Sequence, residues 1–135
     1  MGTLKTTLKV ESTDLFPTPV SFTNVNNNGI NGNFNGFNTV TIAAGASAAL
    51  NSSVIDATGA YLYLQSPATN GTGIAVGYSG QTAATTGFGG GTGSLIYLSP
   101  GDTAFVPVGM GVTAANIHAW CPGGTATLYF FIGEK

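Results

Sequence analysis

The chain has 135 residues, of which 6% are charged, and its formal net charge is −2. This length suits one domain with an ordinary hydrophobic core, and we expect a single domain over residues 1–135. An average soluble domain carries about 25% charged residues, so the charge content is unusually low. The three cations are all lysine, too few to line up against phosphates or an anionic bilayer. Nucleic acid and membrane are therefore excluded as expected partners.

Hydrophobic residues make up 43% of the chain, which predicts a folded protein rather than a disordered one. No apolar run is long enough to span a bilayer. The N-terminus lacks the apolar core of a secretory signal, and the single Cys121 excludes an internal disulfide, so we expect synthesis in a reducing cytoplasm.

The N-terminal third begins with alternating polarity over residues 3–11, the period of two that predicts a half-buried strand. Two prolines within 16–19 interrupt pairing, and a second strand is expected over about 20–25. The Asn- and Gly-rich residues 26–38 predict a loop that holds the apolar residues Ile30, Phe34 and Phe37.

In the middle of the chain, strands are expected over 38–44, 60–65 and 73–79. Residues 43–50 are rich in alanine and leave a helical turn as the less favoured alternative. Residues 80–94 contain Phe88 among five glycines between 87 and 93, which predicts a flexible loop.

The C-terminal third gives the clearest pattern. Strands over 95–98 and 103–108 flank a Ser-Pro-Gly-Asp turn, so a hairpin is expected there. Further strands follow over 113–120 and 125–132, and both faces of the last one are apolar, which predicts a central position. Eight or nine short strands predict an all-β, antiparallel β-sandwich that is jelly-roll-like.

The inventory of reactive residues does not favour an enzyme. His118 is the only histidine, so no multi-histidine metal site can form, and neither a metal nor a cofactor is expected. A triad of Ser79 and His118 with Asp102 or Asp56 stays open only because scattered residues of these types occur in most proteins. Asp102 is expected to accept hydrogen bonds within its own turn.

Several aromatic residues suggest either carbohydrate binding or packing. Aromatic faces stack on the apolar faces of sugars, and histidine supplies hydrogen bonds. Packing in the core or at an interface is the favoured interpretation, and carbohydrate binding is the alternative. The residues concerned are Trp120, Tyr61, Tyr63, Tyr78 and His118.

From Leu95 onward the chain resembles the C-terminal half of small all-β virion proteins of tailed bacteriophages. Those proteins commonly have a strand, a Pro-Gly-acid turn, a strand of the "AFVPV" type, and a final strand near the carboxyl end. The positions that match are Leu98, Pro100, Gly101, Asp102, Phe105, Pro107, Ala119, Leu128 and Tyr129. The resemblance covers about a third of the chain and consists of turn chemistry and alternation.

The resemblance implies a virion protein, made in the cytoplasm of a bacterial host, that decorates or stabilises the capsid surface. Proteins of this kind are similar to head decoration or cement proteins, or to short knob and fibre modules, and are often trimeric. The expected partners are therefore copies of the chain and the major capsid protein or another virion protein. A receptor-binding or lectin-like module of a tail or fibre is the alternative. The candidate interface residues, apolar side chains in polar surroundings, are Ile30, Phe34, Phe37, Phe88 and Trp120. For the first four, packing back against the core is an equally open alternative.

Overall fold

The computed structural model describes residues 2–12, 20–30, 34–50, 59–78, 94–108 and 117–134. These residues form ten β-strands and no helix, and accordingly no helix among them is long and apolar enough to cross a membrane. The strands are β1 (Gly2–Ser12), β2 (Val20–Ile30), β3 (Phe34–Ile42), β4 (Ser47–Ala49), β5 (Ala60–Gln65), β6 (Ile74–Tyr78), β7 (Ser94–Leu98), β8 (Thr103–Val108), β9 (Ile117–Trp120) and β10 (Ala126–Glu134). The expected all-β, antiparallel fold is confirmed.

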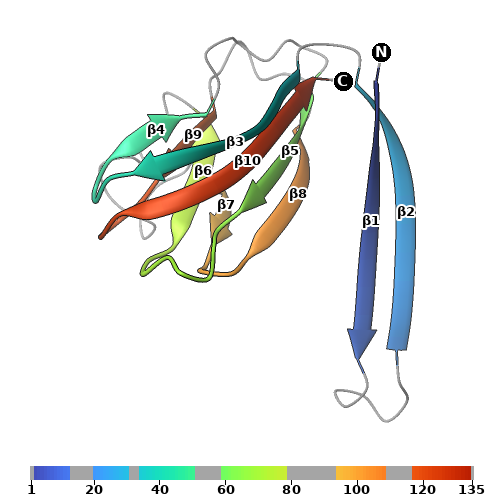
Figure 1. Ribbon diagram of the computed structural model, residues 1–135, viewed down its shortest axis with the longest axis horizontal. Helices are drawn as coiled ribbons and strands as arrows, with labels where there is room; N and C mark the ends of the chain where they lie inside the picture. The colour runs from blue at the N-terminus through green and yellow to red at the C-terminus, as the bar shows by residue number, and fades with distance from the viewer. Residues whose placement is uncertain are drawn as a thin grey trace.

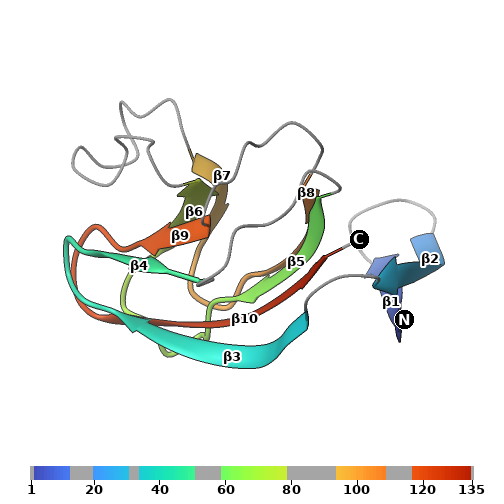
Figure 2. The ribbon, with the colours of Figure 1, turned by 90° about the horizontal axis from the view of Figure 1, so that it is seen from above.

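The strands form a sandwich and a separate arm. One four-stranded sheet has the order β3-β10-β5-β8, and the other has the order β4-β9-β6-β7. Strands β1 and β2 pair only with each other, and Figure 1 shows this two-stranded arm standing beside the sandwich. Seen from above in Figure 2, the two sheets of the sandwich face each other and the arm lies outside both.

The strand pairs of the sandwich are nested about the connection between β6 and β7. Strand β6 pairs with β7, β5 with β8, β4 with β9, and β3 with β10, all antiparallel. Successive pairs alternate between the two sheets. The second half of the sandwich therefore retraces the first half in reverse order.

The turn at Ser99–Asp102 corrects one expectation, because β7 and β8 do not form a hairpin. They lie in different sheets, so the turn carries the chain across the sandwich. Gly101 has φ of 93°, a left-handed conformation that glycine adopts without strain. The Asp102 carboxylate accepts a hydrogen bond from the Ser99 backbone N–H at 2.8 Å, which confirms its expected place within the turn.

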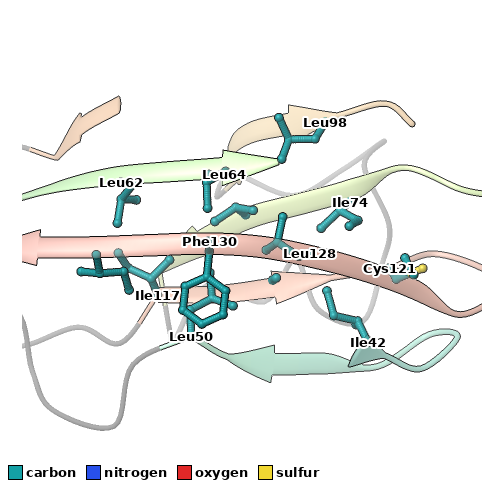
Figure 3. Packing of buried hydrophobic residues seen from close by; sticks show 14 of the residues in the cluster. Ile42, Leu50, Leu62, Leu64, Ile74, Leu98, Ile117, Cys121, Leu128 and Phe130 are labelled. Atoms are coloured by element: carbon teal, nitrogen blue, oxygen red, sulfur yellow. The ribbon is translucent and has the colours of Figure 1, made fainter. Parts of the chain in front are cut away.

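The core lies between the two sheets and is built by alternation. Strand β5 buries Leu62 and Leu64 and turns Tyr61 and Tyr63 outward, as its burial pattern shows. Strand β10 lies between β3 and β5, so its expected central position is confirmed. Figure 3 shows the buried side chains that meet between the sheets, among them Ile42, Leu50, Leu62, Leu64, Ile74, Leu98, Ile117, Cys121, Leu128 and Phe130.

One other sequence expectation fails, and one less favoured alternative is excluded. Residues 26–30 and 34–38, expected as loop, belong to β2 and β3. Asparagine fits there because a two-stranded arm leaves side chains in water, and the Asn28 amide Nδ2 donates to Thr6 Oγ1 of the neighbouring strand at 3.2 Å. The alanine-rich residues 43–50 form a turn and β4 rather than a helical turn.

A single asparagine ties the loop after β5 to the start of β10. Strand β5 pairs with β10 up to Gln65 and Tyr129, and the same register would next bring Pro67 opposite Thr127. Proline has no N–H and cannot extend the ladder. The Asn70 side chain replaces it, since Nδ2 donates to the Thr127 carbonyl at 2.8 Å and Oδ1 accepts from the Thr127 N–H at 2.9 Å.

Candidate interaction surfaces

One face of the arm carries exposed apolar side chains, which share it with Thr6, Asn24, Asn26 and Asn28. Residues that pair directly across an antiparallel ladder share a face, and Val10 pairs with Phe22 while Leu8 pairs with Asn24. The exposed fractions are 59% for Leu8, 49% for Val10 and 51% for Phe22, and Leu4 on the same face is half-buried. We call Leu4, Leu8, Val10 and Phe22 the apolar arm face. The strand over 3–11 is confirmed, but within this chain it is not half-buried as its alternation predicts.

The opposite face of the arm holds its charges and the exposed Val25. Lys5, Lys9 and Glu11 alternate with the apolar residues of β1. The Lys9 Nζ lies 2.9 Å from Glu11 Oε1, and the Ser21 hydroxyl donates to the same carboxylate oxygen at 3.4 Å. Both side chains of the ion pair are more than half exposed, so it contributes little stability. Charge thus separates the two faces of the arm.

The outer face of the sheet β3-β10-β5-β8 carries a row of aromatic side chains, one from each strand. The register places Phe131 opposite Phe37 and Tyr63, and Tyr63 opposite Phe105. Directly paired residues share a face, so the four rings cross the whole sheet. We call Phe37, Phe131, Tyr63 and Phe105 the aromatic row.

Three rings of the aromatic row, those of Phe37, Phe131 and Tyr63, make contacts that centre on Phe37. The centroids of Phe37 and Phe131 lie 5.5 Å apart, and those of Phe37 and Tyr63 lie 5.9 Å apart in an edge-to-face arrangement. These separations fall within the favourable range for aromatic pairs. Phe131 is 1% exposed although it lies on an outer face, whereas Phe37 is 73% exposed. The row is therefore ordered by its own contacts and presents Phe37 to solvent.

Uncharged residues surround the aromatic row. Tyr61 stacks on Phe105 with a centroid separation of 5.6 Å, and the hydroxyl of Tyr63 donates to Gln65 Oε1 at 3.1 Å. Tyr129, 42% exposed, points outward from β10. The other outward positions of these strands that the structure describes are threonines, Gly133 and Pro107. This face offers apolar area and neutral hydrogen-bonding groups.

The five candidate interface residues do not converge. Phe37 belongs to the aromatic row, and Trp120 is half-buried on the outer face of the other sheet, opposite Ser47 and Ala75. Ile30 ends β2 and Phe34 begins β3, but their side chains lie outside the described residues, as does all of Phe88. Their role at an interface stays a prediction.

The sugar-binding candidates divide between the two sheets. Tyr61 and Tyr63 lie on the outer face of one sheet, and His118 and Trp120 on the outer face of the other. Tyr78 ends β6, and its side chain is outside the described part. A single surface using all five is therefore not formed.

The reactive residues do not assemble into a described catalytic site. His118 lies in β9 and Asp102 in a turn between sheets, while Ser79 and Asp56 fall outside the described residues. Within the described ranges, no group of three or more His, Cys, Asp or Glu could hold a metal ion. Comparison with family models, curated proteins and solved structures finds no match to the chain.

Sequence reasoning missed the two surfaces that the fold creates. The alternation over β1 identifies Leu4, Leu8 and Val10 as one face but gives no sign that the face stays uncovered. The aromatic row needs the register of four strands, which turn and alternation signals do not supply. Its only sequence signal is the repeated spacing of two, as in Tyr61 and Tyr63 or Tyr129 and Phe131.

Proposed function

We propose that this chain is a structural protein of a bacteriophage virion that decorates or stabilises the capsid through contacts between its own copies. The observation that carries the proposal is the arm, whose apolar face is exposed in the single chain. A lone two-stranded hairpin is marginally stable in water. An arm of this kind gains stability when a partner covers it, and a multi-copy assembly supplies that partner at high local concentration.

The strand topology of the sandwich supports the proposal. Eight strands in two sheets with nested pairing favour the assignment as a jelly roll, an architecture used by viral capsid and lectin domains. The same architecture hosts unrelated functions, so the surfaces carry more weight than the fold. The resemblance of the C-terminal third to phage virion proteins adds a second, independent line of support.

The low charge of the chain also suits an assembled protein. A net charge far from zero keeps copies of a protein apart, whereas this chain has a formal net charge of −2. Its uncharged outer sheet face can approach another surface without the cost of burying an unpaired charge. Contacts with copies of itself, expected to form a trimer, and with the major capsid protein are the partners that we propose.

The test is to purify virions under mild conditions and quantify this chain by mass spectrometry against the major capsid protein. We expect a fixed copy number that matches the symmetry of the capsid. A chain found only in the lysate and absent from particles would refute the proposal. A stabilising role would be refuted if particles produced without this gene resist heat and low salt as well as particles that contain the protein.

A receptor-binding or lectin-like module is the second candidate, and the aromatic row is the observation that favours it. Tyr63 combines an aromatic face with a hydroxyl, and Gln65 lies within hydrogen-bond distance of that hydroxyl, which is a usual combination in sugar sites. A glycan array with the full chain, repeated with Tyr63→Ala, tests this function. Binding that requires Tyr63 would support it, and an array without signal would exclude the glycans tested.

A further inference from the structure

We propose that the apolar arm face of one copy packs across the aromatic row of a second copy of the same chain. The inference rests on the proposed self-assembly and names the two surfaces that meet. Each surface has an exposed side chain in the single chain, with Leu8 59% and Phe37 73% exposed, although Phe131 within the row is 1% exposed. Figures 1 and 2 show the arm lying outside both sheets of the sandwich.

The two surfaces match in length. The apolar arm face runs from Leu4 to Val10, six residue steps or about 20 Å of extended strand. The aromatic row crosses four strands, and three strand spacings amount to about 15 Å. An arm laid along the row would therefore bring side chains of its apolar face over each of the four strands.

The two surfaces also match in charge. The charged side chains of the arm, those of Lys5, Lys9 and Glu11, lie on its opposite face. The outward positions of the receiving sheet that the structure describes carry aromatic residues, threonine, glutamine and proline. Packing in this orientation leaves the charges in water and buries no unpaired charge, whereas the reversed orientation would bury the lysines.

The exposed apolar area available to each contact is that of a small interface. Leu8, Val10 and Phe22 are each about half exposed, as is Tyr129, and Phe37 is 73% exposed. With roughly 150–250 Å² for a fully exposed large side chain, these five present about 500 Å² of apolar surface per copy. A standard interface buries roughly 800 Å² per partner, of which about 450 Å² is apolar. Because the arm residues lie in one contact and Phe37 and Tyr129 in the other, each partner brings about 250 Å² of apolar area to a contact, which is at the small end of specific interfaces.

The contact joins two different surfaces, so it is heterologous. A heterologous contact closes into a ring when the rotation between copies permits it. Each copy in the ring gives its arm to one neighbour and receives the arm of the other. A closed trimer, the expected state, would leave no apolar arm face uncovered.

Cross-linking between differently labelled copies tests the pairing. We would mix full-length Leu8→Cys with full-length Phe37→Cys, oxidise the mixture, and look for a disulfide that joins one chain of each kind. The native Cys121 is buried and does not compete. In the matched controls the cysteine is moved to another position. Val25→Cys, on the other arm face and 48% exposed, is used instead of Leu8→Cys, and Tyr97→Cys, on the other sheet and 52% exposed, is used instead of Phe37→Cys.

We expect the mixed disulfide from Leu8→Cys with Phe37→Cys and at least about tenfold less from either control pair. Equal yields from the three pairs would overturn the proposal. In a chain that carries both Leu8→Cys and Phe37→Cys, a disulfide formed only within the same chain would overturn it as well, because the arm would then cover its own sheet.

Assembly measurements give an independent readout. Leu8→Ser and Phe37→Ser should each raise the dissociation constant of the oligomer by about tenfold, since each removes a large apolar side chain from the contact. Val25→Ser and Tyr97→Ser should leave it within about threefold, because those positions lie outside the contact. Light scattering and serial dilution report both values.

Failure of this inference is distinguishable from failure of the proposed function. An oligomer that persists unchanged in Leu8→Ser and Phe37→Ser would overturn the arm contact and leave the virion role intact. A chain that stays monomeric at its highest soluble concentration would overturn the contact with a second copy. The copy number in purified particles, measured separately, decides whether the chain is a virion protein at all.

Discussion

Replacing Asn70 by alanine tests whether one side chain holds the loop after β5 against β10. Its amide makes three hydrogen bonds, two to the backbone of Thr127 and one from Nδ2 to Ser66 Oγ at 3.0 Å. Each contributes about 0.5–1.5 kcal/mol net, and buried partners left without a bond cost more. Ser66 is fully buried, and Pro67 cannot supply the missing N–H. We therefore expect Asn70→Ala to lower the free energy of unfolding by about 2–3 kcal/mol.

Urea unfolding followed by tryptophan fluorescence, at one fixed protein concentration, measures this loss. The midpoint of thermal unfolding should fall by roughly 8–12 °C for a chain of this size. Asn70→Asp keeps an acceptor for the Thr127 N–H but has no donor for the Thr127 carbonyl. At neutral pH this variant should therefore lower the free energy of unfolding by at least as much as Asn70→Ala. The exposed Asn27 provides the control, since Asn27→Ala should change stability by less than about 0.5 kcal/mol. A loss as small as this in Asn70→Ala would refute the reasoning.

Two further predictions concern the core. Leu62→Ala should destabilise the chain by about 2–5 kcal/mol because Leu62 is fully buried, whereas Tyr61→Ala on the outer face of the same strand should cost clearly less in the same urea titration. The Cys121 thiol is buried, with its Sγ 3.2 Å from the Gly124 carbonyl oxygen. It should react with a thiol reagent slowly in the native chain, at a rate limited by opening of the protein, and rapidly in urea. Fast labelling of the native chain would contradict its burial.

The sequence identifies most strands of the sandwich because their signals are local. Residues 60–65 alternate between apolar and polar or aromatic positions, and the strand occurs there with the same bounds. The turn at Pro100-Gly101 is equally clear, since its chemistry fixes a reversal of direction. The same chemistry does not fix whether the two flanking strands pair, which is why β7 and β8 were expected as a hairpin and lie in different sheets.

The arm and the aromatic row could not be predicted for a related reason. An Asn- and Gly-rich composition favours loops, but it is also tolerated in an exposed ribbon where the strand partner supplies hydrogen bonds, as Thr6 does for Asn28. Which strand lies opposite Tyr63 depends on contacts between residues far apart in the chain, and no local signal encodes them. Surfaces that several strands build together therefore appear only with the register.

The lysines of the arm are expected to oppose the addition of further strands, because both strands of a two-stranded sheet are edges. Exposed edges with apolar side chains invite further strands to add without limit, and lysines on such an edge are a common means of opposing this. Lys5 and Lys9 alternate with Thr3 and Thr7 along β1, so a second β1 placed alongside would bring lysines close together. Like charges directly opposite each other destabilise a ladder.

Replacing both lysines by threonine keeps the strand pattern and removes this repulsion. We expect the Lys5→Thr, Lys9→Thr chain to form large aggregates, seen as light scattering that grows with time, while the native chain stays at its defined assembly. Salt should move the native chain in the same direction, since roughly 0.15 M screens charges beyond about 8 Å. Thr3→Ser with Thr7→Ser, which leaves the charges in place, is the control. A double lysine variant that stays as soluble as this control would show that the lysines do not protect the edge.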